Sequence, residues 1–290
     1  MSFKKNIIDL YGQRGQNWLD NLPEFYKKSA IKWNLFDLKP FENLSYNYVL
    51  GGKRDGSSII LKLACDKNEL QQEINALIHF DGHGSVKLLG YDLELGAILL
   101  ERLLPGEDLK SMFSAQEKES IEITCKVIRK LHSASRENLK NFKNISDWLV
   151  ALNRDWNLPL NHLKKARELS EYLLATSAEQ VLLHGDLHHE NILSSGKNEW
   201  VAIDPKGIVG EPVYEVGAFI RNPMPELLEA PNVLQIIQKR IEYFAKNLNF
   251  DAQRIYQWVY VQSILGACWS LDGNQDPSYF IELANIIEKH

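Results

Sequence analysis

The stretch His184-Gly185-Asp186-Leu187-His188-His189-Glu190-Asn191-Ile192-Leu193 decides the fold of this chain, together with Trp200-Val201-Ala202-Ile203-Asp204-Pro205 further along. Each stretch contains or adjoins a short apolar run of the strand type that delivers an acidic residue to its end. Turn-forming residues at 194–198 separate the two and let the chain double back. We therefore expect three side chains to converge: Asp186, Asn191 and Asp204. Two carboxylates and one amide oxygen are hard ligands that suit Mg²⁺ beside a phosphate-bearing substrate.

Two other interpretations of this stretch need to be weighed. His184 and His188 have the i,i+4 spacing of a zinc site. Gly185 and the strand-like flanks argue against the helix that such a site needs, and no distant Cys or Glu completes the ligand set, so zinc is disfavoured. An isolated Asp–Asn pair is also commonly a turn device that bonds to its own backbone. The histidines are then expected to support the loop.

The overall composition is that of an ordinary globular protein. The chain has 290 residues, of which 44% are hydrophobic and 24% charged, enough for one large domain or two lobes. A net charge of -5 predicts no general attraction to nucleic acid and is compatible with a cationic small substrate. Cys65, Cys125 and Cys268 lie in scattered apolar settings and are expected to be buried free thiols.

No targeting or membrane-spanning segment is visible. The N-terminus has basic residues but no sustained apolar segment behind them. The most apolar late segment, 255–271, is interrupted by Gln257, Gln262 and Ser263, so it is predicted to be a buried helix. The expected location is the cytoplasm, with no membrane partner.

The first hundred residues show the pattern of a small, mostly antiparallel sheet with one helix. Residues 1–28 are predicted to be partly helical, ending at Pro23. The predicted strands cover 31–38, 48–50, 59–63, 86–91 and 97–101. Asp55-Gly56 is a hairpin signal between the second and third strands. A helix is expected over 69–80, capped by Asp66 or Asn68.

Beyond a connector at 102–106 the apolar residues recur with helical spacing. The predicted helices cover 117–132, 148–156, 161–176, 234–248, 252–271 and 279–289. The fold class is therefore α+β in two lobes, with a sheet-rich lobe over 1–101 and a larger, mainly helical lobe over 102–290.

Lys62 is a charged residue in the middle of an apolar strand. Burying an ammonium group without a partner is costly, so this residue needs either water or an acid. Glu73, eleven positions later on the predicted helix, can meet it if the helix packs across the sheet. The alternative is an edge-strand lysine whose ammonium reaches solvent.

Two common phosphate-binding signatures are excluded. Gly51-Gly52-Lys53-Arg54 lacks the preceding glycine and the following Ser or Thr of a P-loop. Gly82-His83-Gly84 lacks the third glycine and the strand-to-helix context of a dinucleotide fingerprint. Neither loop is expected to hold a phosphate.

The order and spacing of Lys62, Glu73, His184-Gly185-Asp186 with Asn191, and Ile203-Asp204 resemble the protein-kinase-like phosphotransferases of small molecules. The match is closest to the aminoglycoside phosphotransferases, whose signature has the form H-G-D-L-H-x-x-N-I-L. The segments 203–215 and 99–106 look like the branch that contains streptomycin 6-kinase and hydroxyurea kinase. The resemblance covers nearly the whole chain.

The resemblance implies an ATP- and Mg²⁺-dependent enzyme. It implies that Lys62, held by Glu73, binds the α- and β-phosphates. Asp186 would accept the proton of the acceptor hydroxyl as it attacks the γ-phosphate, and Asn191 and Asp204 would hold Mg²⁺.

The remaining nucleotide contacts implied by the resemblance come from two backbone segments. The loop 44–47, with Ser45, would cover the phosphates in place of a glycine-rich loop. Glu101 to Leu103 would be the hinge that recognises adenine through backbone groups.

The chain departs from its relatives at several positions. Gly185 stands where protein kinases carry arginine, so control by a phosphorylated activation loop is not implied. Asp204 is followed by Pro205, not by Phe-Gly. Glu215 stands where this branch is expected to have aspartate, which leaves the structural role of that position open.

The implied acceptor is a small hydroxylated molecule, most specifically an aminoglycoside of the streptomycin type. A polycation would favour carboxylates near Asp186, and the candidates, with one possible packing surface, are Glu211, Glu215, Asp272, Asp276 and Trp269. Ordinary surface or core roles are the alternative for each of them. Choline, homoserine or a sugar is the alternative acceptor. A nucleotide-binding pseudokinase is disfavoured because every catalytic position is occupied, and both monomer and dimer stay open.

Overall fold

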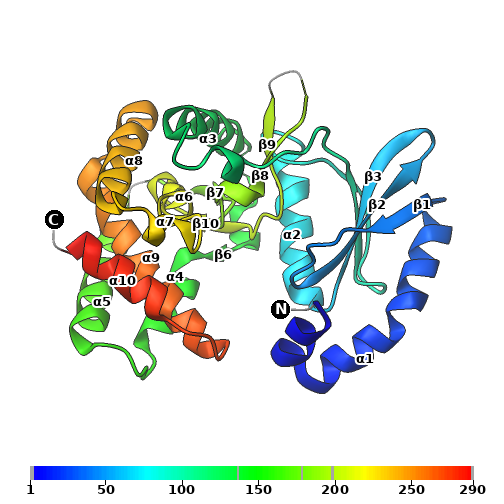
Figure 1. The fold of residues 1–290 in the computed structure, drawn as a ribbon, viewed down its shortest axis with the longest axis horizontal. Helices are drawn as coiled ribbons and strands as arrows, with labels where there is room; N and C mark the ends of the chain where they lie inside the picture. Colours follow the sequence, from blue (N-terminus) through cyan, green and yellow to red (C-terminus); the bar gives the residue numbers. More distant parts are fainter. Residues whose placement is uncertain (1–2, 136, 178, 197–198, 289–290) are drawn as a thin grey trace.

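The chain folds into two lobes, a sheet-rich one and a helical one (Figure 1). The structure is a computed structural model that describes residues 3–135, 137–177, 179–196 and 199–288. An antiparallel sheet occupies the first hundred residues and helices dominate the remainder. The predicted α+β architecture, with a sheet-rich lobe followed by a mainly helical one, is therefore confirmed.

The sheet of the first lobe has five antiparallel strands in the order β1-β2-β3-β5-β4. Their bounds are Phe36–Pro40, Asn47–Arg54, Ser57–Ala64, Leu88–Asp92 and Ala97–Glu101 for β1 to β5. Helix α1 (Phe3–Lys32) lies on the outer side of the sheet, and α2 (Lys67–Phe80) lies on the side that faces the helical lobe (Figure 1). Leu61 and Leu63 join the core under α1. Because side chains alternate along a strand, Lys62 between them points toward α2.

The predicted hairpin turn and helix cap of this lobe are both present in the structure. Asp55 and Gly56 adopt the left-handed backbone (φ 49° and 81°) of a tight β2–β3 hairpin. Asp66 caps α2 by accepting hydrogen bonds from the backbone N–H groups of Asn68 (2.8 Å) and Glu69 (3.1 Å). The helix therefore presents Glu73 at a defined position on its inner face.

The predictions for the N-terminal segment were wrong in two respects. The helix does not end at Pro23 but continues to Lys32, and the strand expected over 31–38 begins only at Phe36. Trp18 and Leu22 belong to one core cluster with the sheet, so tertiary packing holds the helix through the proline. Gly12, with φ 56° and ψ −133°, kinks α1 and folds its first arm back.

The helical lobe is built around α9 (Ala252–Asp272), whose middle is almost entirely buried. The other long helices are α3 (Glu117–His132), α5 (Leu160–Ala175), α8 (Val233–Leu248) and α10 (Ser278–Glu288), close to their predicted bounds. The helix expected over 148–156 is shorter: α4 covers Ile145–Leu149 and a 3-10 turn, η3, covers Val150–Asn153. A capping box at Asn144 starts α4 early. Within the described residues, no helix combines the length and apolarity needed to cross a bilayer.

Two short sheets in this lobe carry the candidate site. One has the order β6-β10-β7, and the other is the antiparallel pair β8-β9. Their bounds are Lys143–Asn144 (β6), Val181–Leu183 (β7), Ile192–Ser194 (β8), Trp200–Ala202 (β9) and Ile208–Gly210 (β10). The doubling back of the chain between 194 and 200 is therefore confirmed, although Lys197 and Asn198 of the expected turn lie outside the described residues.

Short helical segments complete the lobe. They are η1 (Leu109–Met112), η2 (Leu139–Asn141), η4 (His189–Asn191), η5 (Pro212–Glu215), α6 (Val216–Ile220) and α7 (Glu226–Glu229). The sequence did not predict α6 or α7. Cys65, Cys125 and Cys268 are buried and free, as expected.

Candidate active site

Lys62 is the point at which the two lobes meet electrostatically. Its Nζ lies 2.8 and 2.9 Å from the two carboxylate oxygens of Glu73 and 3.1 Å from Oδ1 of Asp204, and the residue is 4% exposed. The solvent-facing alternative is thereby excluded. Burial alone would lower the pKa of Lys62, but the Asp204 and Glu73 carboxylates raise it above its ordinary value. The ammonium group is therefore charged.

The β8–β9 hairpin brings Asn191 and Asp204 to the same end of the sheet. Ile192 pairs with Ala202, and the Ile203 N–H donates to the Asn191 carbonyl at 2.9 Å. Asp204 follows with a left-handed backbone (φ 57°), which aspartate tolerates better than most residues. Burial raises the pKa of Asp204, whereas the Lys62 ammonium group lowers it. The net pKa lies below the ordinary value. Its side chain stays 42% exposed.

His184 braces the two loops that carry the acids. Its Nδ1 accepts the Asp186 N–H at 3.2 Å, and its Nε2 donates to the Ile203 carbonyl at 2.7 Å. This pair of bonds requires the neutral imidazole, and burial lowers the pKa of His184. The interpretation of this histidine as loop support is consistent with these contacts. Among the described residues no group of three or more His, Cys, Asp or Glu side chains is placed to hold a metal ion.

Glu215 anchors the catalytic loop from beneath. Its carboxylate accepts the backbone N–H groups of His184 (2.7 Å) and Gly185 (3.0 Å), and His132 Nε2 lies 3.4 Å away. The side chain has no exposed surface. Burial raises its pKa, but His132, His184 and the Gly185 N–H together bring the pKa below its ordinary value, so the carboxylate keeps its negative charge. Glu215 is therefore not a substrate-binding acid, and the role left open for this position is that of a buried anchor.

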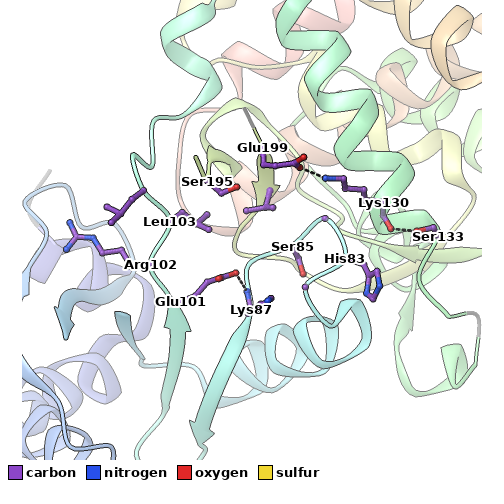
Figure 2. A pocket seen from close by; sticks show the side chains of 14 residues that line it. His83, Ser85, Lys87, Glu101, Arg102, Leu103, Lys130, Ser133, Ser195 and Glu199 are labelled. Atoms are coloured by element: carbon purple, nitrogen blue, oxygen red, sulfur yellow. Dashed lines mark hydrogen bonds and ion pairs between the residues drawn. The ribbon is translucent and has the colours of Figure 1, made fainter. Parts of the chain in front are cut away.

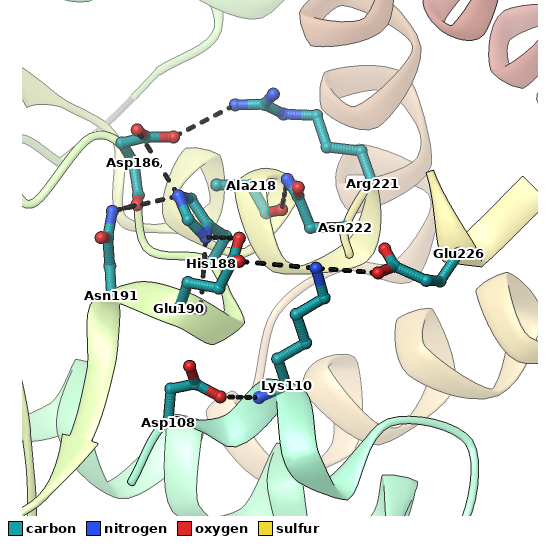
Figure 3. Close-up of polar contacts among 10 residues, drawn as sticks. All are labelled: Asp108, Lys110, Asp186, His188, Glu190, Asn191, Ala218, Arg221, Asn222 and Glu226. Atoms are coloured by element: carbon teal, nitrogen blue, oxygen red, sulfur yellow. Dashed lines mark hydrogen bonds and ion pairs between the residues drawn. The ribbon is translucent and has the colours of Figure 1, made fainter. Parts of the chain in front are cut away.

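Asp186 has a partly exposed side chain and no tight hydrogen-bond partner on its carboxylate. Oδ1 lies 3.6 Å from an Nη atom of Arg221, and Oδ2 lies 3.9 Å from Nε2 of His188 (Figure 3). Burial raises the pKa of Asp186, but His188, Arg221 and Lys206 together bring it below its ordinary value. The carboxylate is ionised and free to accept a proton. Its backbone carbonyl accepts the Asn191 side-chain amide at 2.8 Å.

The arrangement of Asn191 fits a magnesium ligand. Its amide nitrogen is used by Asp186 and His188, and its Oδ1 accepts no hydrogen bond from any residue that the structure describes. This oxygen and the exposed Asp204 carboxylate are hard donors at one end of the same hairpin. One or two protein oxygens, supplemented by substrate phosphates, is the usual donor set for Mg²⁺.

Ser45 lies in the exposed loop between β1 and β2. Its carbonyl accepts a hydrogen bond from the Asn6 side chain of α1 at 3.2 Å. Tyr46 next to it accepts one from Gln275 of the helical lobe at 3.3 Å. The loop thus touches both α1 and the segment after α9.

Glu101 and Leu103 lie at the junction of the lobes. The Leu103 N–H donates to no described residue and is free to meet a ligand. The Glu101 carboxylate instead accepts the Lys87 N–H at 2.9 Å and lines a hollow of about 600 Å³ that runs toward α3 (Figure 2). None of the five predicted catalytic side chains lines this hollow, so it is distinct from the Lys62–Asp204 site.

The candidate substrate acids behave differently from one another. Glu211 is 6% exposed and binds Arg254 at 2.7 Å, so it is structural. Asp272 pairs with Arg154 at 2.8 Å on the surface, and Asp276 binds Ser278 at the start of α10. Neither of these two acids points to a defined subsite.

Trp269 is the better candidate for a substrate surface. It is 40% exposed and meets Trp148 edge to face, with the ring centroids 5.4 Å apart. Trp148 in turn is so close to Gly185 that a Cβ there would lie 3.0 Å from its ring. Gly185 also has φ 84°, so glycine is required on both counts. An aromatic wall, Trp148 and Trp269, therefore borders the catalytic loop.

Arg221, whose side chain lies beside Asp186, was not predicted from the sequence. The signal was available, because Arg221 directly follows the apolar run 216–220, just as Lys62 lies inside one. Without the fold, nothing indicated that α6 ends beside Asp186.

The family profile described as aminoglycoside/hydroxyurea antibiotic resistance kinase matches residues 33–273. The chain belongs to this family of kinases. It is 25% identical to streptomycin 6-kinase of Streptomyces glaucescens, over 97% of this chain and 94% of that protein. It is 28% identical to streptomycin 3''-kinase of Klebsiella pneumoniae, over 82% and 89% of the two chains.

Solved structures agree on the fold of this family member. The aminoglycoside phosphotransferase APH(4)-Ia, in a complex with ADP and hygromycin B, superposes with a TM-score of 0.67 at 14% identity, covering 90% of this chain and 97% of that one. Choline kinase LicA from Streptococcus pneumoniae gives a TM-score of 0.66 at 14% identity, covering 93% and 98%. The predicted family, the kinase class and the fold are all confirmed.

Proposed function

We propose that this kinase transfers the γ-phosphate of ATP to a hydroxyl of a streptomycin-type aminoglycoside, with Mg²⁺. The observation that carries the proposal is the position of the Lys62 ammonium. It contacts Glu73 in the first lobe and Asp204 in the second, beside a hairpin that also presents Asn191 and leads back to Asp186. A charged lysine, two metal-binding oxygens and a free carboxylate are the parts that phosphoryl transfer requires.

The first lobe, residues 1–101, is proposed to bind the nucleotide. Lys62 would bind the α- and β-phosphates, and Glu73 keeps its side chain in place through two hydrogen bonds. The loop with Ser45 would cover the phosphates, and the free backbone N–H of Leu103, next to Glu101, would recognise the adenine. Neighbouring kinases were solved with ADP or AMP-PNP, which supports an adenine nucleotide.

Asn191 Oδ1 and the Asp204 carboxylate are proposed to hold the magnesium. Bound there, the ion would supply positive charge that offsets the charge of the phosphates. Asp204 approaches Lys62 at 3.1 Å in the structure, so its carboxylate is already directed toward the proposed phosphate position.

In the second lobe, residues 102–290, Asp186 is proposed to act as the general base. It would accept the proton of the acceptor hydroxyl while that oxygen forms its bond to the γ-phosphorus. The bond from phosphorus to the β,γ-bridging oxygen breaks, and ADP leaves with the electron pair. His184 and Glu215 hold the backbone of the loop, so the base is in position before substrate arrives.

The acceptor assignment rests on the streptomycin kinases among the relatives and on the site itself. The aromatic wall beside Gly185 offers a face for a sugar ring or a cationic group. The net charge of -5 favours a cationic substrate over an anionic one.

The test is a transfer assay with the purified protein, ATP and Mg²⁺. With streptomycin present, the enzyme should consume ATP in proportion to the phosphorylated product formed. Mass spectrometry identifies this product, and phosphorus NMR locates the phosphate on it. Asp186→Asn is the matched control, since it keeps the shape of the side chain but removes the base. Phosphorylation of choline or homoserine but not streptomycin would contradict the acceptor, and absence of both nucleotide binding and transfer would refute the whole proposal.

A further inference from the structure

Arg221 is nearly buried, and its guanidinium has an ion-pair contact with Asp186 but makes no hydrogen bond. The side chain is 13% exposed, its Nε is enclosed without a hydrogen-bond partner, and no described residue accepts a hydrogen bond from it. Its nearest acid is Asp186, at 3.6 Å from one Nη, which is too long for a hydrogen bond (Figure 3). An arginine has five N–H donors, and enclosing even the Nε donor without a partner is costly.

Two other arginines with little exposed surface, Arg240 and Arg254, show the contrast within the described chain. Arg240 donates hydrogen bonds to Glu117 and to the carbonyl oxygens of residues 219, 220 and 222. Arg254 binds Glu211, Thr176 and the Leu173 carbonyl. A structural arginine in this fold satisfies its donors within the protein. Arg221 does not, so its donors are available for a ligand.

The backbone around Arg221 is firmly held while its side chain makes no hydrogen bond. Arg240 binds carbonyl groups on both sides of it, and the Tyr279 hydroxyl donates to the Arg221 carbonyl at 2.7 Å. Glu215, six residues earlier on the same segment, holds the catalytic loop. One rigid segment therefore fixes both the backbone of Asp186 and the base of the arginine beside it.

The distance from Arg221 to Asp186 places the guanidinium within reach of the reaction. An attacking hydroxyl would lie about 3 Å from Asp186 and about 3–3.5 Å from the phosphorus in a near-attack arrangement. The phosphoryl oxygens then fall within one side-chain adjustment of Arg221. The long contact also leaves both Asp186 oxygens able to accept a proton, which a tight two-bond salt bridge would prevent.

We propose that Arg221 is a catalytic residue that binds the phosphoryl group as it passes to the acceptor oxygen beside Asp186. This rests on the proposed function. While the new O–P bond forms and the bond to ADP breaks, negative charge spreads over the three equatorial oxygens of the phosphoryl group. The N–H donors of Arg221 that make no hydrogen bond within the protein stabilise this charge. The proton of the acceptor goes to Asp186, and Arg221 exchanges none.

Steady-state kinetics of Arg221→Ala and Arg221→Lys test the role. Arg221→Ala should lower kcat about 100- to 1,000-fold, the usual effect of removing one transition-state donor, with KM for ATP changed less than about threefold. Arg221→Lys should recover part of the loss, and low-millimolar guanidinium should partly restore Arg221→Ala. Arg129→Ala, an exposed arginine that binds the Asn247 carbonyl far from the site, is the matched control. Unchanged kcat in Arg221→Ala overturns the proposal.

Binding of a transition-state mimic separates this proposal from the acceptor assignment. Aluminium fluoride should tighten ADP–Mg²⁺ binding to the wild type at least tenfold, and Arg221→Ala should lose this gain while binding ADP alone normally. If the wild type forms the complex but phosphorylates no aminoglycoside, only the acceptor is wrong. If Arg221→Ala keeps the full gain, or loses ADP binding and its thermal transition together, Arg221 is structural and the proposal fails.

Discussion

The catalytic loop, residues 184–191, and the phosphate loop would meet at the same phosphate, yet they are built in opposite ways. The phosphate loop is here the connection between β1 and β2, residues 41–46; the predicted segment was 44–47, and its last residue, Asn47, begins β2. The catalytic loop is held by Glu215 beneath it, by His184 within it and by the hairpin behind it, largely in buried surroundings. The phosphate loop is mostly exposed, and the side chains that bind it, Asn6 and Gln275, do so through exposed hydrogen bonds.

The difference between the two loops reflects their proposed tasks: the catalytic loop positions the general base, and the phosphate loop closes over the nucleotide. A general base must be aligned within a fraction of an ångström, so its supports are part of the fold. A loop that covers a nucleotide must open to admit it and therefore belongs to the low-stability part of the molecule. Changes to the catalytic loop should cost far more than equivalent changes to the phosphate loop.

The largest effect is expected at the proposed base. Asp186→Ala should lower kcat by about 100- to 10,000-fold, because the acceptor proton loses its partner, while ATP binding is retained. Parallel measurements of turnover and of nucleotide affinity by calorimetry check this. A variant with wild-type kcat would remove Asp186 from the mechanism.

The next effect is expected at the buried anchor. Glu215→Ala leaves the His184 and Gly185 N–H groups without an acceptor, at about 1–3 kcal/mol each, and should lower both stability and kcat. Glu215→Asp, which keeps the charge but is one methylene shorter, should lose less. Urea unfolding and turnover are measured on both variants. Equal stability of Glu215→Ala and wild type would show that the catalytic loop does not depend on this anchor.

A smaller effect is expected from pH. Burial lowers the pKa of His184, and burial together with Arg240 lowers that of His189 well below its ordinary value. The unfolded chain therefore binds more protons below pH of about 6.5, so stability is full above that pH and falls as the pH drops, by about 1.4 kcal/mol per pH unit for each histidine.

His189→Phe isolates one of these two contributions. His189 stacks on Phe219 with ring centroids 3.9 Å apart, so a phenyl ring can occupy the same place without a titrating group. Urea midpoints between pH 5 and 6.5 should fall less steeply with acid in this variant than in the wild type. Identical slopes would mean that His189 does not titrate on unfolding.

The smallest effect is expected at the phosphate loop. Asn6→Ala removes one exposed hydrogen bond to the Ser45 carbonyl, worth about 0.5–1.5 kcal/mol at most. KM for ATP should rise less than about tenfold, with kcat and KM for the acceptor unchanged, and hydrogen exchange in 41–46 should quicken. A loss of kcat comparable to that of Glu215→Ala would erase the contrast between the two loops.

Much of this arrangement could be read from local patterns. A lysine inside an apolar strand needs a partner, and helical spacing offered Glu73, which the structure places at 2.8 Å. The hairpin between 192 and 202 followed from two apolar runs separated by turn residues. The extent of α1 could not be read in this way, because Pro23 and the alternation after Ile31 are local signals that packing against the sheet overrides.

The sequence by itself determined the elements that carry chemistry, because buried charges and turn residues have few physical solutions. It predicted that Asp186, Asn191 and Asp204 converge, and it offered Glu73 as the partner of Lys62. Only the tertiary structure decided how Asp186 is surrounded. Glu215 beneath its loop and Arg221 beside its carboxylate come from a segment thirty residues downstream, and contacts over such a separation depend on how α6 packs against α9, which no local pattern encodes.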